Sequence, residues 1–424
     1  MNVLGIIAEY NPFHVGHAYQ IETLKKETGA AYTIIAMSGN FVQRGAPALM
    51  EKYSRTKMAL RCGADLVLEL PIFYAAASAE HFARGGIALL ESTGVVTHLG
   101  FGTETKDFTL LQEIAALFNH PPKLFQEALR QGIKKGLSFP AARSHAIITS
   151  LEQEKRLPDS AINIKNVLAS PNNILAIEYL RALSCYCSNI LPCPLLRRGQ
   201  QYHDTSPGQE FSSASAIRAS ILERELSQKD FTVKGSCLDA LKQTLPEGAF
   251  DILKNYSHPF LHENDFSSLL HYKLMTESVP QLSCYADVSL DLARRIKKEI
   301  DSFCSWNSFC SHLKSKNTTY TRLSRMFLHI ILNIYHEDYH PFPEPSYLRV
   351  LGFCKKAAPL LAAIKSQGKL PIITSPTDAQ GLLNKSAQNL LWRDLESSSL
   401  YRIGLAAKGD NQLKNDYQQP FICL

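Results

Sequence analysis

The sequence predicts an α/β protein in which a mostly parallel sheet is followed by a mainly helical C-terminal region. Over the first hundred residues, short apolar runs rich in β-branched residues alternate with helical stretches. The length of 424 residues and a hydrophobic fraction of 45% allow two or three domains with buried cores. A polar, turn-rich segment from about Ser227 to Gly248 then separates the alternating part from a helix-dominated part. These three observations define the predicted fold class.

The N-terminal strands are predicted from apolar runs that end in glycine, proline or polar residues. They span Val3–Tyr10, Ala31–Gly39, Asp65–Pro71 and Thr97–Glu104. Helices are expected between them, through Ile21 and Leu24, over Ser54–Ala64 and over Glu80–Leu90. Since strands joined by helices run parallel, ligands are expected at the carboxyl ends of these strands.

The rest of the chain is predicted to be mainly helical with a few strands. Residues 108–185 look helical, Asn189–Gly199 resembles one more strand, and serines precede a helix within Phe211–Glu225. Residues 250–340 are helix-dominated, with an apolar helix around Arg325–Tyr335, and a short strand is expected at Lys369–Ser375. We therefore predict a first domain over 1–226 and a mainly helical region over 227–424, with a small terminal α/β part from about 345.

Composition excludes several classes of protein. The formal net charge of +6 is mild, and no basic tail indicates nucleic acid. The first residues lack a positive segment, and no apolar stretch is long enough for a membrane span, so neither a signal peptide nor membrane insertion is expected. The ten cysteines are irregularly spaced, and the cluster of Cys304, Cys310 and His312 does not match zinc spacing. We expect reduced thiols, no metal ligands and a cytoplasmic protein.

The strongest functional pattern is NPFHVGH, Asn11 to His17, which directly follows the first strand and begins the first helix. A helix N-terminus offers free N–H groups and partial positive charge, which suits phosphate. Gly16 allows close backbone approach, and His14 and His17 lie on one side of the first turn. Both imidazoles can stabilise a leaving pyrophosphate by hydrogen bonds, which indicates nucleotidyl transfer.

The motif resembles the HxGH signature of the nucleotidyltransferase superfamily, whose members bind ATP on a Rossmann-like parallel sheet. SSASAIR, from Ser212 to Arg218, is similar to a second element of that superfamily, a serine-rich helix start that holds ATP phosphates. Taken alone, Ser212 and Ser213 are more simply interpreted as helix caps. No P-loop, HExxH zinc motif or KMSKS-like lysine loop occurs in the sequence.

The resemblance narrows to the bacterial tRNA(Met) cytidine acetate ligase family, over essentially the whole chain. It rests on an ordered set of segments: GIIAEYNPFHVGH, SGNFVQRG, GADLVLELP, SAEHFARG, LGFGTE, SPNNILAIEYL, the Arg197-Arg198 pair, TYTRLSR and YLRVLGF. The resemblance implies activation of acetate by ATP to acetyladenylate, followed by acetylation of N4 of the wobble cytidine of elongator tRNA(Met). It implies ATP as a substrate, with Mg²⁺ accompanying it.

The resemblance also implies a set of site residues. His14 and His17 would be catalytic, and Ser212, Ser213 and Arg218 would bind phosphate. The residues expected to bind ATP are Ile7, Ala8, Glu9, Tyr10, Asn11, Pro12, Phe13, His14, Val15, Gly16, His17, Ala18, Tyr19, Gln20, Gly102, Asn172, Arg197 and Arg198. Asn173 is an alternative to Asn172. Two departures from the family pattern are Ala46, where we expect Glu, and Gln20, where His is common.

The acceptor and RNA sites are predicted less sharply. Gln43 and Arg44 are candidate walls of an acetate pocket, although a purely structural loop explains them equally well. For RNA, one basic run holds Arg294, Arg295, Lys297 and Lys298, and a second holds Lys314, Lys316, Arg322 and Arg325, near Tyr320. An aromatic ring among cations can stack on an unpaired base, but a solvated helix face has equal weight. Tyr320, Arg322 and Arg325 are our candidate tRNA contacts.

Two other functions remain as alternatives. A small-molecule adenylyltransferase of coenzyme synthesis would share the N-terminal chemistry but leaves the long region after the first domain unexplained. A non-catalytic RNA-binding protein with a decayed nucleotide fold is disfavoured by the intact HxGH motif.

Overall fold

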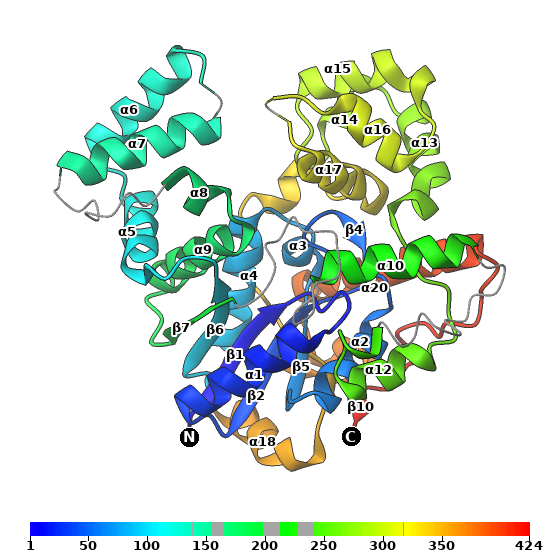
Figure 1. Ribbon diagram of the computed structural model, residues 1–424. Helices are drawn as coiled ribbons and strands as arrows, with labels where there is room; N and C mark the ends of the chain where they lie inside the picture. The colour runs from blue at the N-terminus through cyan, green and yellow to red at the C-terminus, as the bar shows by residue number, and fades with distance from the viewer. Residues whose placement is uncertain (138, 154–163, 198–212, 228–240, 317) are drawn as a thin grey trace.

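The computed structural model describes residues 1–137, 139–153, 164–197, 213–227, 241–316 and 318–424. Within these residues an eight-stranded, mostly parallel sheet occupies the centre of the molecule (Figure 1). The strand order is β10-β8-β5-β2-β1-β6-β7, and β9 pairs with β8. The strands are β1 (Val3–Ala8), β2 (Tyr32–Ser38), β5 (Leu66–Leu70), β6 (His98–Thr103), β7 (Leu191–Leu196), β8 (Leu348–Phe353), β9 (Ile372–Ile373) and β10 (Ile422–Cys423).

The α/β class with a mostly parallel sheet and a helical C-terminal region is confirmed. Each strand predicted for the N-terminal part is present. Along the sheet, the neighbouring strands in the order β5-β2-β1-β6-β7 are all paired in parallel. The helices of this part are α1 (Val15–Thr28), α2 (Lys52–Arg61), α3 (Ile72–Ala75), α4 (Ala79–Ser92), α5 (Phe108–Asn119), α6 (Lys123–Lys134), α7 (Phe139–Gln153), α8 (Ile164–Ala169), α9 (Pro171–Cys185) and α10 (Ala214–Ser227).

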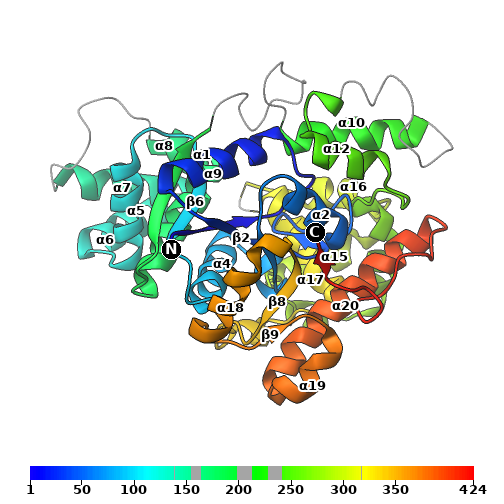
Figure 2. The same cartoon turned by 90° about the horizontal axis from the view of Figure 1, so that it is seen from below.

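Both faces of the sheet are covered, as parallel sheets require. Because successive strand residues point to opposite faces, Val3 and Ile7 of β1 enter the core that includes α4, whereas Leu4 and Ile6 enter the core that includes α1. Figure 2 shows α1 and α4 on opposite sides of β1. This arrangement brings the start of α1 to the carboxyl end of β1, in the middle of the sheet.

Helices α13 (Ser267–Thr276), α14 (Val279–Ser283), α15 (Leu290–Glu299), α16 (Trp306–Leu313) and α17 (Tyr320–Leu332) stand above the sheet at the upper right of Figure 1. The other α-helices of the C-terminal part are α12 (Glu247–Lys254), α18 (Ala358–Gln367), α19 (Ala379–Leu382) and α20 (Lys385–Ala407), and α18 lies below the sheet in that view. The core of α13–α17 also takes in Phe41 and Phe73 from the N-terminal part and Tyr401 from α20. The two parts therefore share a packed boundary.

The residues beyond about 345, predicted as a small terminal α/β part, add strands to the central sheet. Strand β8 is the antiparallel neighbour of β5, and β10 adds to β8. The strand predicted over Lys369–Ser375 is the two-residue β9, which extends the same sheet. Pairing between strands as distant in the sequence as β5 and β8 is decided by tertiary packing, which local patterns do not encode. The division at residues 226 and 227 stays a prediction.

Candidate active site

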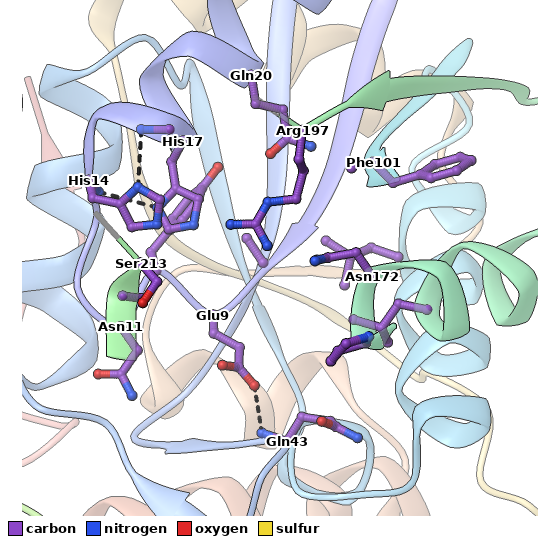
Figure 3. Close-up of a pocket in the computed structure, with 18 of the residues that line it drawn as sticks. Glu9, Asn11, His14, His17, Gln20, Gln43, Phe101, Asn172, Arg197 and Ser213 are labelled. Carbon is purple, nitrogen blue, oxygen red and sulfur yellow. Dashed lines mark hydrogen bonds between the residues drawn. The ribbon is translucent and has the colours of Figure 1, made fainter. Parts of the chain in front are cut away.

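The two histidines of the HxGH motif form the start of α1. His14 is the N-cap residue, and its Nδ1 accepts a hydrogen bond from the backbone N–H of Gly16 at 3.0 Å. The backbone N–H of His14 in turn donates to Nδ1 of His17 at 3.2 Å. The rings stack with centroids 3.8 Å apart (Figure 3). Since each Nδ1 accepts a hydrogen bond, each neutral ring carries its proton on Nε2.

Electrostatics keep both rings neutral. Burial lowers the pKa of His14 to about 3, assisted by Arg197 and Arg218. The pKa of His17 also lies well below its usual value, first because of burial and then because of His14 and Arg197. A neutral imidazole with its proton on Nε2 is a hydrogen-bond donor. The pair can therefore donate to phosphate oxygens at neutral pH.

The histidines border a cavity of about 410 Å³ at the carboxyl ends of the parallel strands. Residues that line this active-site cavity come from the end of β1, the start of α1, the ends of β6 and β7, and the starts of α4, α9 and α10. Its position agrees with the expectation for an open α/β sheet. Predicted site residues that line it are Ile7, Ala8, Glu9, Tyr10, Asn11, His14, Gly16, His17, Tyr19, Gln20, Gly102, Asn172, Arg197, Ser213 and Arg218.

Four residues of the predicted ATP-binding run do not line the cavity. Pro12 and Phe13 are buried, Val15 donates its backbone N–H to Thr244, and Ala18 packs beside the core that includes α1. The run is a continuous stretch of chain, whereas a helix start presents only part of its surface to a ligand. Arg198 and Ser212 lie outside the residues that the structure describes.

A second helix start meets the first at this cavity. Ser213 caps α10 by accepting the backbone N–H of Ala216 at 3.2 Å. Arg218 donates from Nη1 to the carbonyl oxygen of Asn11 at 2.7 Å, which ties α10 to the HxGH turn. Two helix N-termini with partial positive charge thus converge beside Arg197 and Arg218, an arrangement that favours an anion.

Gly102 and Asn172 border the opposite side of the cavity. Gly102 of β6 lies beside Leu195 of β7, and a Cβ at Gly102 would lie 3.3 Å from Cγ of Arg197. Asn172 lines the cavity and donates to Glu104 at 2.5 Å. Asn173 is buried and accepts the backbone N–H of Glu104 at 2.8 Å. Asn172 is thus the residue of the two that faces the cavity.

Sequence reasoning missed the apolar lining of the cavity. Phe101, Leu175 and Tyr179 border it from β6 and α9, and Figure 3 shows Phe101 on the same side as Asn172. Apolar residues of a strand and a helix are indistinguishable from core residues in a sequence, so no local signal identifies them. Gln43 and Arg44, the candidate acetate-pocket walls, also line the cavity.

The candidate tRNA contacts separate into exposed and buried residues. Arg322 is exposed, and the hydroxyl of the partly buried Tyr320 donates to Asn307 at 2.8 Å. Arg325 is buried and forms an ion pair with Asp287 at 2.9 Å, so it does not belong to an exposed RNA-binding surface. The reason is its place nearly one turn further along α17, where the backbone of that helix packs against the turn at Gly45.

Two further observations concern metals and membranes. Among the described residues, no group of three or more His, Cys, Asp or Glu side chains is arranged to hold a metal ion. In the same part of the chain, no helix is long and apolar enough to cross a membrane.

A parallel sheet with paired histidines at the first helix start defines a nucleotidyltransferase of the HIGH type. The sequence profile of that family, described as HIGH Nucleotidyl Transferase, matches residues 1–416. A tRNA(Met) cytidine acetate ligase from Halothermothrix orenii is 37% identical over 429 residues, covering 100% of this chain and 99% of the relative. The chain belongs to the tRNA(Met) cytidine acetate ligase family within the HIGH nucleotidyl transferases.

Solved structures agree with this assignment. Apo TmcAL from Thermotoga maritima superposes with a TM-score of 0.90 at 30% identity, and each chain is covered completely. TmcAL from Thermotoga maritima bound with alpha-thio ATP superposes with a TM-score of 0.87 at 29% identity, again over 100% of both chains.

Proposed function

We propose that this protein forms acetyladenylate from acetate and ATP and transfers the acetyl group to N4 of the wobble cytidine of elongator tRNA(Met). The observation that carries the proposal is the convergence of two helix starts, one with paired neutral histidines and one with Ser213 and Arg218, on a single cavity. Full-length similarity to enzymes named tRNA(Met) cytidine acetate ligase supports the choice of substrates. A cytoplasmic location fits an enzyme that acts on tRNA.

In the first step, a carboxylate oxygen of acetate attacks the α-phosphorus of ATP and pyrophosphate leaves. Nε2–H groups of His14 and His17 donate to the leaving pyrophosphate, where negative charge builds up. Arg197 and Arg218 hold phosphate oxygens as charged donors. Mg²⁺ accompanying ATP would supply positive charge that offsets the charge of the phosphates, beside Arg197 and Arg218. No covalent intermediate on the protein is needed.

In the second step, cytidine N4 attacks the carbonyl carbon of acetyladenylate and AMP leaves. A wobble base reaches the cavity only if the anticodon arm is held nearby, and the exposed cations of α15–α17 and their loops are our candidates for that contact. They include Lys298, Lys314 and Arg322. Single-stranded loops of RNA are typically read by cations and aromatic rings together.

The proposal is tested by ATP–pyrophosphate exchange with a series of small carboxylates, with and without tRNA. We expect exchange with acetate in the absence of tRNA, and weaker exchange with larger carboxylates, since added bulk must be accommodated in a confined site. A small-molecule adenylyltransferase would instead catalyse ATP–pyrophosphate exchange with a coenzyme precursor and not with acetate. Absence of exchange with every carboxylate, in a folded protein that binds RNA, would favour the non-catalytic alternative.

The Arg322→Ala variant tests the RNA surface. We expect weaker tRNA binding and a salt dependence reduced by about one unit of slope if Arg322 contacts one phosphate. Acetate-dependent exchange without tRNA should stay close to that of the parent protein. A matched control is Lys57→Ala, which removes an exposed cation from α2. Equal salt slopes for the parent and both variants, measured by tRNA binding over a salt titration, would exclude Arg322 from the interface.

A further inference from the structure

The two half-reactions of the proposed function differ in their need for a base. Acetate attacks ATP as an anion and has no proton to lose. Cytidine N4 is a weakly nucleophilic amine, and it must lose a proton when it becomes an amide. A group that accepts this proton raises the rate of the second half-reaction only. The following inference therefore rests on the proposed function and concerns its second step.

The histidines of the cavity are not suited to accept that proton. Both Nδ1 atoms already accept backbone hydrogen bonds, and both Nε2 atoms carry the proton of a neutral ring. Burial raises the pKa of the Tyr10 phenol, and burial together with Glu9 raises that of Tyr179, so both phenols remain protonated. Among the cavity-lining residues that the structure describes, Glu9 is the one carboxylate.

Glu9 is held in a fixed position at the carboxyl end of β1. The backbone N–H of Gln43 donates to Oε1 of Glu9 at 2.9 Å, as drawn in Figure 3. The carbonyl oxygen of Glu9 accepts from Nη1 of Arg55, a fully buried side chain, at 2.6 Å. Within the described part of the chain, no hydrogen bond engages Oε2. One carboxylate oxygen is thus anchored and the other is available.

The turn of residues 43–45, which anchors Glu9, packs against the helical region. Ser324 of α17 donates from Oγ to the carbonyl oxygen of Gly45 at 2.9 Å, and Nε1 of Trp306 donates to Ser324 at 3.0 Å. Gly45 has a φ of +78°, and a Cβ there would overlap the backbone of Arg325. Because the helix packs directly on this turn, the backbone N–H of Gln43 is fixed in place beneath Glu9.

A carboxylate here carries an electrostatic cost. The cavity is proposed to bind ATP and acetate, which are both anions, and Glu9 repels them. Arg44, Arg197 and Arg218 line the same cavity and offset that repulsion. A positioned negative charge in a site built for anions indicates a chemical role that a neutral side chain cannot fill.

We propose that Glu9 is the general base of the acyl-transfer step. As N4 bonds to the acetyl carbon, the carbonyl π electrons move to oxygen, and Oε2 of Glu9 takes the N4 proton. The carbonyl then re-forms while the bond from the acetyl carbon to the AMP phosphate oxygen breaks. The products are the N4-acetylated base, AMP and a protonated Glu9, which returns its proton to water.

The test separates the two half-reactions in the full-length protein. Acetate-dependent ATP–pyrophosphate exchange reports the first, and acetylation of tRNA(Met) in a single turnover, after preincubation with ATP and acetate, reports the second. We expect Glu9→Gln to lower the acyl-transfer rate by roughly 10²–10³ and the exchange rate by less than about fivefold. Glu9→Asp keeps a base with a shorter reach, and it should restore part of the transfer rate.

Glu104→Gln is a matched control, because it makes the same change at a nearby carboxylate that contacts Asn172 and does not line the cavity. We expect it to change both half-reactions to a similar extent. The inference is overturned if Glu9→Gln transfers at the parent rate, or if exchange falls as much as transfer and recovers at higher Mg²⁺, which would assign Glu9 to metal–nucleotide binding. A parent protein inactive in acetate exchange would instead overturn the proposed function itself.

Discussion

Alanine in place of either His14 or His17 is expected to lower the rate of acetate-dependent ATP–pyrophosphate exchange by roughly 10²–10³, the effect of losing one preorganised donor to a developing charge. Both variants should also lose some stability. His14 is the N-cap of α1, and His17 completes the capping box by accepting the backbone N–H of His14, so each loss should cost about 0.5–2 kcal/mol. Exchange kinetics and thermal denaturation measure the two effects separately. Parent-like exchange in both variants would contradict the donor role.

The same pair also predicts a pH dependence. A histidine that acted as a cationic acid would lose activity as the pH rises through its ordinary range. Because the pKa of His14 lies at about 3 and that of His17 is well below its usual value, both rings are neutral throughout that range. The pH profile of kcat/KM for exchange reports the free enzyme, and we expect it to show no histidine titration between about pH 5 and 8.

Much of the site could be predicted because its parts are local. A β-branched strand, a turn and a helix start follow one another between Val3 and Thr28, so the position of His14 and His17 at the carboxyl end of β1 is implied by their order. Likewise, Ser213 and Arg218 belong to one helix start. The two helix starts are joined by the hydrogen bond from Arg218 to the carbonyl oxygen of Asn11. These residues are 207 positions apart, so no local sequence pattern predicts their contact.

Charged residues inside the fold are harder to predict. A cation in a sequence is most often exposed, so the pattern around Arg325 predicts a solvated or RNA-binding face. Its partner Asp287 lies 38 positions earlier and is brought close only by the packing of α17. Strand β8 is not predicted for a related reason, because Arg349 interrupts the apolar pattern of the strand. The guanidinium of Arg349 is nevertheless buried between two carboxylates from distant parts of the chain.

Those carboxylates belong to a buried charge cluster of Lys52, Glu69, Arg349 and Asp416. Lys52 Nζ lies 2.8 Å from Glu69 and 3.1 Å from Asp416, and Arg349 lies 3.0 Å from Glu69 and 3.4 Å from Asp416. Each side chain is at most 5% exposed. Positive and negative groups alternate, so the cluster is neutral. It joins α2 and β5 to β8 and to the segment that precedes β10.

Asp416→Asn is expected to destabilise the protein by about 3–5 kcal/mol, because it leaves one buried positive charge without compensation. Lys52→Met should have a comparable cost, since it leaves a buried negative charge. The double variant removes one charge of each sign and keeps the Arg349–Glu69 pair, so its cost should be well below the sum of the single costs.

Thermal and chemical denaturation of the four proteins at neutral pH would measure this coupling. An exposed pair gives a contrast: removing Arg393, which contacts Glu396 at 3.1 Å on the surface of α20, should cost no more than about 1 kcal/mol. Additive costs for Lys52→Met and Asp416→Asn would mean that the two charges are compensated independently. Strong coupling would mean that the C-terminal segment is bound to the catalytic sheet through charge neutrality, in addition to the pairing of β10 with β8.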